Sequence, residues 1–162
     1  GSQVAAVGKA FGMDVIAWSR NLTEERCAAL GVRRADSLGA LIAASDIVSV
    51  HLVLGDRSRG LIGPAELAAM KPGALLVNTS RGPIVQEAAL IAALGTGRIS
   101  AALDVYDVEP LPADHPFRSL PNLTMTPHLG YVSAGNYRSH YAHAVEDIEA
   151  YLRGAPVRVL KP

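Results

Sequence analysis

Short runs of apolar and β-branched residues alternate with alanine- and leucine-rich segments along most of the chain. Strands that are almost wholly apolar and separated by helices are typical of a parallel sheet covered by helices on both faces. We therefore expect an α/β fold with a doubly wound parallel sheet. The predicted strands are Met13–Trp18, Asp46–Leu52, Ala74–Val77, Ile99–Asp104 and Leu123–Thr126, with Val32–Arg33 as a further short candidate.

Helix start and stop signals stand between the predicted strands. Thr23 and Ser37 are typical N-cap residues, and Pro64 suits a first helical turn. Gly31 and Gly95 are expected to end two of the helices. A further helix is predicted to follow Gln86 and Glu87, and a last, long one covers Ser133–Arg153, with apolar residues at helical spacing before Gly154.

Composition excludes several classes of protein. Lys plus Arg and Asp plus Glu both number 15, so no excess of positive charge favours a nucleic-acid partner. With 49% hydrophobic and 19% charged residues the chain is typical of a packed domain, and no apolar run approaches the roughly 18 residues of a membrane helix. Cys27 is the single cysteine and is predicted to be a buried, inert thiol, and no secretory signal is seen. We expect a cytoplasmic protein.

Polar residues whose side chains can bind a substrate or transfer a proton follow three predicted strands. Arg81 lies in an Asn-Thr-Ser-Arg-Gly segment, Asp104 and Glu109 follow the next strand, and His128 lies in Pro-His-Leu-Gly. Ligands of doubly wound sheets bind at the carboxyl ends of the strands. A guanidinium can hold a carboxylate at two points, and an imidazole paired with a carboxylate can act as acid or base. This set suits redox chemistry on a 2-oxo or 2-hydroxy acid, although each residue alone is equally compatible with an ordinary loop residue.

These three motifs, with Met70-Lys71-Pro72-Gly73 and His51, resemble the D-isomer-specific 2-hydroxyacid dehydrogenase family. The resemblance runs from Gly1 to about Gly154. It implies a Rossmann-like NAD(P)-binding domain at residues 1–132 and a C-terminal helix and tail at 133–162 that return to a substrate domain. It also implies that Arg81 binds the substrate carboxylate and carbonyl, that His128 exchanges the proton, and that Glu109 is the partner of His128.

The resemblance further implies a set of residues that contact the cofactor, partly through their backbone groups. Asp104 is expected to lie beside the nicotinamide, and the alternative is that Asp104 only forms a turn. No carboxylate follows the predicted strand Met13–Trp18, so Arg20 is available for a 2′-phosphate and NADP is favoured over NAD. A solvated Arg20 is the alternative. The expected cofactor-binding residues are Gly1, Ser19, Arg20, Leu52, Thr79, Ser80, Arg81, Asp104, His128, Leu129 and Gly130.

The chain departs from the family pattern at its beginning. The family's domain opens with a strand and a Gly-x-Gly-x-x-Gly turn, and only the last glycine of that turn is recognisable here, as Gly1. The alternative is that Gly1-Ser2 is a cloning remnant. The missing strand would lie in the middle of the sheet, so we expect two half-sheets with unpaired edges. We interpret the chain as a C-terminal fragment that shows no turnover alone, from a parent protein expected to be a homodimer.

Competing interpretations remain for the function. Formate dehydrogenases resemble this pattern but pair the histidine with Gln, whereas Glu109 stands here. A dinucleotide-sensing binding module would keep the same Arg, Glu and His, and an inactive remnant would bind nothing. Among the other histidines, His51 is expected to cap a strand and His115 to shape its loop. His140 and His143 lie three residues apart near Glu146 but lack further ligands, so we expect no metal site.

Overall fold

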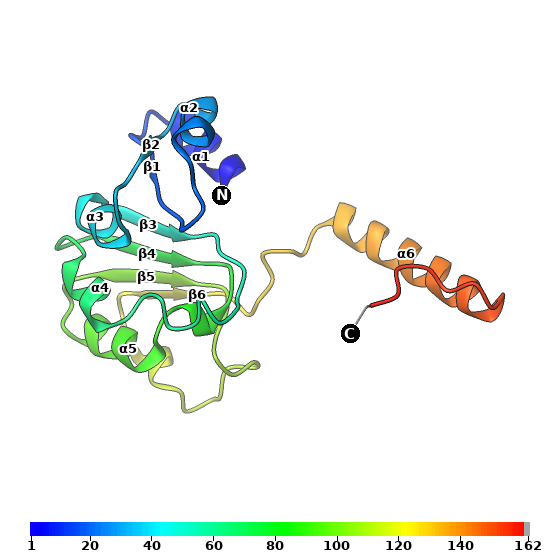
Figure 1. Ribbon diagram of the computed structural model, residues 1–162. Helices are drawn as coiled ribbons and strands as arrows, with labels where there is room; N and C mark the ends of the chain where they lie inside the picture. The colour runs from blue at the N-terminus through cyan, green and yellow to red at the C-terminus, as the bar shows by residue number, and fades with distance from the viewer. Residues whose placement is uncertain (161–162) are drawn as a thin grey trace. The chain divides into compact units, whose positions relative to one another are not determined.

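The computed structural model describes residues 1–160 and contains two compact units, Gly1–His128 and Leu129–Pro162 (Figure 1). The first unit holds all the strands of the described chain, and the second holds one long helix. The strands of the first unit form a four-stranded parallel sheet and a two-stranded parallel sheet. The predicted α/β class with a parallel sheet is therefore confirmed.

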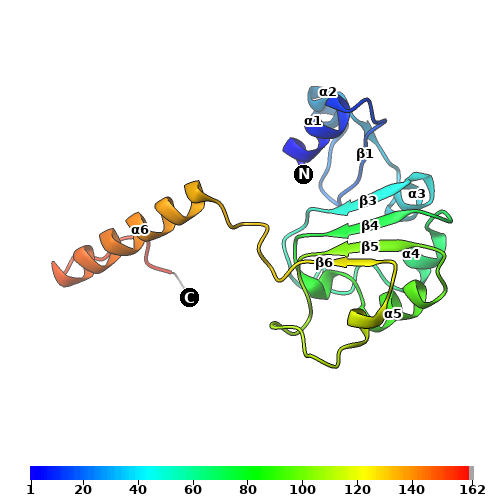
Figure 2. The same ribbon diagram turned by 180° about the vertical axis from the view of Figure 1, so that it is seen from behind.

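The four-stranded sheet places its strand ends in line. Its order is β3 (Ile47–Val50), β4 (Leu75–Asn78), β5 (Ser100–Leu103) and β6 (Leu123–Met125). The register pairs Val50 with Asn78, Asn78 with Leu103, and Leu103 with Met125. Because all four strands are parallel and end together, the residues that follow them share one edge of the sheet, at the arrowheads in Figures 1 and 2.

Helices α3 (Leu38–Ala44), α4 (Pro64–Ala69) and α5 (Glu87–Gly95) cover one face of this sheet. Alternate strand residues such as Val48, Leu76 and Ala101 are buried against them. The intervening residues are exposed or half-buried, as Ile47 is at 49%. Within the first unit, the face of the sheet that packs against α3–α5 is therefore the buried one.

The cap residues form the contacts that their chemistry predicts. The Thr23 side chain accepts a hydrogen bond from the Arg26 N–H at 3.3 Å at the start of α2 (Glu24–Leu30), and Ser37 accepts one from Ala40 at 3.0 Å. Gly31 ends α2 with φ of 61°, in the left-handed region where a side chain is disfavoured. Gly95 is the last residue of α5, so this helix ends where the sequence predicted. The positive φ falls two residues later, at Gly97.

The two-stranded sheet is much shorter than expected. β1 (Ile16–Ala17) pairs only with β2 (Arg33–Arg34), whereas the sequence predicted a strand over Met13–Trp18. A strand extends only as far as a neighbour accepts its hydrogen bonds, and β2 offers two residues. The nearby helix α1 (Ser2–Ala10) packs on α2, and Cys27 of α2 is buried at 1% exposure, as predicted. β1 and β3 belong to separate sheets, as the sequence led us to expect.

The second unit consists of α6 (Ala134–Leu152) and the segment that follows it. Ser133 caps α6 by accepting a hydrogen bond from the Asn136 N–H at 3.2 Å. Arg158 forms ion pairs with Glu146 at 2.7 Å and Asp147 at 2.9 Å, which hold the following segment against the helix. Neither α6 nor any other helix of residues 1–160 is long and apolar enough to cross a membrane.

Candidate active site

A tight turn after β4 shapes one side of the carboxyl edge. The Asn78 side chain, 1% exposed, accepts a hydrogen bond from the Ser80 N–H at 3.0 Å and donates one to the Arg81 carbonyl at 2.9 Å. Its backbone carbonyl accepts from the Asp104 N–H at 3.0 Å, which links β4 to the end of β5. The Ser80 hydroxyl donates to the Val50 carbonyl at 2.7 Å. Asn78 therefore fixes the direction of the segment that carries Arg81.

Arg81 presents its guanidinium to solvent at this edge. One of its terminal nitrogens donates to the Ser80 carbonyl at 2.6 Å. Within residues 1–160 the remaining guanidinium N–H groups have no hydrogen-bond partner, and the residue is exposed. A planar guanidinium with unused donors can bind a carboxylate at two points. The geometry is therefore compatible with the carboxylate-binding role expected for Arg81.

Glu109 and His128 form a hydrogen-bonded pair. The Nδ1 atom of His128 lies 2.6 Å from Oε2 of Glu109, and both side chains are 34% exposed. The other carboxylate oxygen, Oε1, accepts a hydrogen bond from the Tyr106 N–H at 2.9 Å. Because Nδ1 contacts a carboxylate, the imidazole is oriented with its Nε2 edge directed away from Glu109. The structure thus brings Glu109 and His128, which the sequence motifs paired, into direct contact.

The environment of Glu109 favours its ionised form. Partial burial by itself would raise the pKa of Glu109, but the hydrogen bonds from His128 and the Tyr106 N–H oppose it. The positive charges of His128 and Arg81 act in the same direction, so the pKa of Glu109 lies below its usual range. A carboxylate with a lowered pKa stabilises the fold above its unfolded pKa, and this stabilisation is lost as the pH falls through the folded value. Near neutral pH, Glu109 is a fixed negative charge beside His128.

Asp104 is a buried carboxyl group at the end of β5, 5% exposed. The Thr126 hydroxyl donates a hydrogen bond to it, and the Asp104 N–H is bonded to Asn78. These contacts connect the ends of β4, β5 and β6. They place Asp104 among the residues that the sequence assigned to one site.

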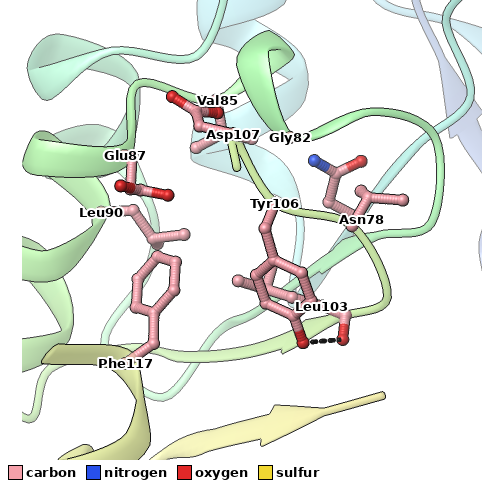
Figure 3. A pocket seen from close by; sticks show the side chains of 10 residues that line it. Asn78, Gly82, Val85, Glu87, Leu90, Leu103, Tyr106, Asp107 and Phe117 are labelled. Atoms are coloured by element: carbon pink, nitrogen blue, oxygen red, sulfur yellow. Dashed lines mark hydrogen bonds between the residues drawn. The ribbon is translucent and has the colours of Figure 1, made fainter. Parts of the chain in front are cut away.

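Gly82 allows the loop of Arg81 to lie against the loop of Glu109. A Cβ atom at Gly82 would come within 2.2 Å of the Tyr106 carbonyl carbon and 2.6 Å of the Asp107 nitrogen. Figure 3 shows Gly82 beside Asp107 and Tyr106 at this crossing. Only glycine permits so close an approach of two backbones.

We expect Gly82→Ala to destabilise the chain by about 1–3 kcal/mol, because the two loops must separate to accept the methyl group. Chemical denaturation followed by circular dichroism measures this change. Gly39→Ala in α3 is the matched control, since its Cβ would meet nothing nearer than 3.9 Å, and it should leave stability unchanged or slightly raised. Equal stability of Gly82→Ala and the parent chain would contradict the crossing of the two backbones.

The other predicted cofactor residues lie in four places. Thr79 and Ser80 lie in the turn before Arg81, and Leu52 follows β3 at the same edge. Gly1 precedes α1, where its ideal Cβ position lies 3.4 Å from Cβ of His51. Ser19 and Arg20 follow β1 in the two-stranded sheet, and Leu129 and Gly130 belong to the second unit. The structure therefore gathers the residues after β3–β6 and keeps Ser19 and Arg20 with the smaller sheet.

Sequence reasoning gave no role to several residues that organise the site. The Asn78 amide holds the turn after β4, and the Thr126 and Tyr106 hydroxyls bridge the ends of β5 and β6. A polar side chain at the end of an apolar strand could have indicated these residues, because a buried polar group needs a hydrogen-bond partner.

His115 and His51 make hydrogen bonds outside the Glu109–His128 pair. As predicted, His115 shapes its loop, since Nδ1 accepts from the Phe117 N–H at 3.2 Å and Nε2 lies 3.2 Å from Glu87. His51 lies 2.9 Å from the Ser49 hydroxyl, and burial lowers its pKa. No group of three His, Cys, Asp or Glu side chains within residues 1–160 is placed to hold a metal ion.

Comparison with known proteins identifies relatives of the whole chain. Residues 1–130 match the family model described as D-isomer specific 2-hydroxyacid dehydrogenase, NAD binding domain. A glyoxylate reductase from Aeropyrum pernix is 43% identical over 155 residues, which are 95% of this chain and 46% of that protein. The match covers both the strand ends and the long last helix.

Solved structures agree with the sequence matches. A phosphoglycerate oxidoreductase from Vibrio cholerae has a TM-score of 0.90 at 36% identity, covering 96% of this chain and 50% of that one. The apo form of a D-mandelate dehydrogenase from Rhodotorula graminis has a TM-score of 0.82 at 33% identity, with coverage of 99% and 48%. The chain thus spans about half the length of the proteins that it matches.

Proposed function

The chain belongs to the D-isomer-specific 2-hydroxyacid dehydrogenase family, and from this premise we propose that it carries the catalytic side chains for reversible reduction of a 2-oxo acid to a 2-hydroxy acid. The observation that carries the proposal is the 2.6 Å contact between His128 and Glu109 at the same sheet edge as Arg81. The reaction consumes one hydride and one proton. When bound, a nicotinamide dinucleotide supplies or accepts the hydride.

Each side chain has a distinct role in this proposal. Arg81 binds the substrate carboxylate with its unused guanidinium donors and orients the neighbouring carbonyl. His128 donates a proton from Nε2 to the carbonyl oxygen during reduction and takes it back during oxidation. Glu109 holds Nδ1 and compensates the positive charge that the imidazole carries before it donates. A general acid of this kind typically contributes about 10²- to 10⁴-fold to the rate.

The edge of the sheet offers groups that fit a nicotinamide dinucleotide. Asp104 is a buried carboxyl group that can accept a hydrogen bond from a carboxamide, and Thr79 is an exposed hydroxyl in the turn before Arg81. The N-terminus of α1 at Gly1 lies next to His51, which follows β3. Helix N-termini attract phosphate groups. These positions would hold the nicotinamide and the pyrophosphate of the cofactor.

Arg20 supports a preference for NADP over NAD. It is exposed after β1, and the guanidinium has no ion-pair partner within residues 1–160. The arginines of β2 are occupied, Arg33 by Asp14 and Arg34 by Glu24. Arg20, which follows β1, is therefore available for a 2′-phosphate, and Ser19 precedes it.

We expect Arg20→Ala to raise the Kd for NADPH by about 10- to 100-fold, the value of one or two charge-assisted hydrogen bonds, and to leave the Kd for NADH unchanged. Fluorescence titration with each reduced cofactor measures both constants. Arg26→Ala removes an exposed arginine from α2 and serves as the control. Equal effects of Arg20→Ala on the two cofactors would contradict the assignment.

Turnover requires more than residues 1–162 in this proposal. β1 and β3 are edges of separate sheets, and the described residues provide no strand that pairs with both. We expect the 162-residue chain to show no dehydrogenase turnover by itself, and we propose that the protein as a whole is a homodimer, which light scattering would test. Turnover by the purified chain would contradict the first expectation.

A hybrid enzyme tests the function directly. In it, this chain replaces the 155 matched residues of the Aeropyrum pernix glyoxylate reductase, whose unmodified form is the control. We expect the hybrid to reduce glyoxylate with a reduced nicotinamide cofactor, followed by absorbance. Cofactor binding without turnover would favour a dinucleotide-sensing module, and a folded hybrid that binds no cofactor would favour an inactive remnant.

A further inference from the structure

Tyr106 lies in the loop that carries Glu109 and contacts the segment that leads into His128. It follows β5, is 7% exposed, and packs its ring 6.4 Å from the ring of Phe117. Figure 3 shows the ring directed away from Asp107 and toward Leu103, so that its hydroxyl reaches the end of the sheet. A tyrosine buried to this degree needs a partner for its hydroxyl. The identity of that partner connects Tyr106 to the candidate active site.

The backbone of Tyr106 positions Glu109. Its N–H donates to Oε1 of Glu109 at 2.9 Å, while Oε2 of the same carboxylate contacts His128 Nδ1 at 2.6 Å. Because each carboxylate oxygen has its own partner, the carboxylate plane has little freedom to rotate. The loop from Tyr106 to Glu109 therefore sets the direction from which Glu109 meets the imidazole.

The hydroxyl of Tyr106 holds the segment that leads into His128. It donates to the Thr126 carbonyl at 2.9 Å, while the Leu103 carbonyl is farther away at 3.3 Å. Thr126 is also held by its N–H, which donates to Leu103 at 2.9 Å, and by its hydroxyl on Asp104. Two residues later His128 has φ of 52°, an uncommon conformation for a residue other than glycine. Such a conformation persists only when surrounding contacts hold the segment in place.

We propose that Tyr106 is a positioning residue for the Glu109–His128 pair, its N–H orienting the carboxylate and its hydroxyl fixing the backbone that presents the imidazole. The catalytic meaning of this role rests on the proposed function, whereas the positioning itself concerns only the geometry of the chain. Tyr106 bonds to Glu109 through its N–H and to Thr126 through its hydroxyl, so it acts through these two residues. The plain alternative is a core tyrosine whose ring supplies packing alone.

Tyr106→Phe separates the two interpretations, because it keeps the ring and removes only the hydroxyl. Tyr141→Phe is the matched control, since Tyr141 is 68% exposed on α6. The 162-residue chain labelled with ¹⁵N and ¹³C provides two readouts without any substrate. The ¹⁵N shifts of the His128 ring give the ratio of its two neutral tautomers, and the Glu109 carboxyl shift gives the pKa of Glu109.

We expect the parent chain to hold the proton of neutral His128 on Nδ1. In Tyr106→Phe the ratio of the Nδ1–H to the Nε2–H tautomer should fall about fivefold, which is the effect of one ordinary hydrogen bond. The pKa of Glu109 should rise toward its usual range, since the hydrogen bond from His128, which opposes the effect of burial, becomes weaker. An unchanged tautomer ratio and an unchanged pKa of Glu109 in a folded variant would overturn the proposal.

Folding of the variant is checked first by circular dichroism. If Tyr106→Phe is partly unfolded, the spectra of all three proteins are recorded in trimethylamine N-oxide, which favours the folded state. In the hybrid enzyme the same substitution should lower kcat about fivefold and leave the cofactor Kd unchanged. If Tyr106→Phe changes the tautomer ratio of His128 but the hybrid enzyme shows no turnover, the proposed function is refuted and the positioning role stays intact.

Discussion

Replacing His128 by alanine in the hybrid enzyme is expected to lower kcat by about 10²- to 10⁴-fold. An imidazole can both donate and accept a proton, and its Nδ1 is held 2.6 Å from Glu109. Loss of the ring removes the group that exchanges the proton. It leaves in place the groups assigned to bind the 2′-phosphate and the carboxamide of the cofactor. The cofactor Kd should therefore change little. Steady-state kinetics and cofactor titration measure the two quantities.

Two further variants make the His128 result specific. His128→Gln keeps a side-chain N–H for Glu109 but cannot exchange a proton, so it should be as slow as His128→Ala. His140→Ala removes an exposed histidine from α6 and should leave kcat unchanged. Parent-like turnover of His128→Ala would remove the acid–base assignment.

Arg81→Ala is expected to reduce kcat/KM for the 2-oxo acid by about 10²- to 10⁴-fold, because two charge-assisted hydrogen bonds of about 1.5–3 kcal/mol each would be lost. The guanidinium is exposed and uses one donor on the Ser80 carbonyl. Since the carboxylate is bound in both the ground state and the transition state, much of the loss should appear in KM.

Arg81→Lys should recover only part of the Arg81→Ala loss, since an ammonium group binds a carboxylate at one point. Arg26→Ala again controls for loss of positive charge, and the backbone turn is expected to persist because Asn78 holds it. The assignment of Arg81 fails if Arg81→Ala retains the parent kcat/KM.

Local rules predicted most of the elements along the chain. Thr23 and Ser37 cap helices because a side-chain oxygen can reach an N–H three residues later, which requires no distant residue. Gly31 ends α2 because glycine enters the left-handed region without strain. Gly95 is the last residue of α5, as predicted, and the positive φ follows at Gly97.

Strand limits and helix coverage depended on neighbours that sequence patterns do not specify. The apolar run around Ile16 is long, but β1 has only two residues because β2 accepts no more. Apolar character on both faces of β3 suggested two covering layers, yet α3–α5 cover one face and Ile47 is exposed at 49%. Pairing and burial are properties of two elements together.

The sequence by itself determined the parallel α/β architecture and the identity of Arg81, Glu109 and His128 as the chemically capable residues, because their types and their positions after apolar strands are local properties. Only the tertiary structure decided that His128 meets Glu109 at 2.6 Å, that Gly82 lies against the backbone of Tyr106, and that Tyr106 reaches Thr126. Those contacts join residues about 20 positions apart in the chain, as Tyr106 and Thr126 are. Their distances follow from the register of β4, β5 and β6, which forms only when the strands pack together.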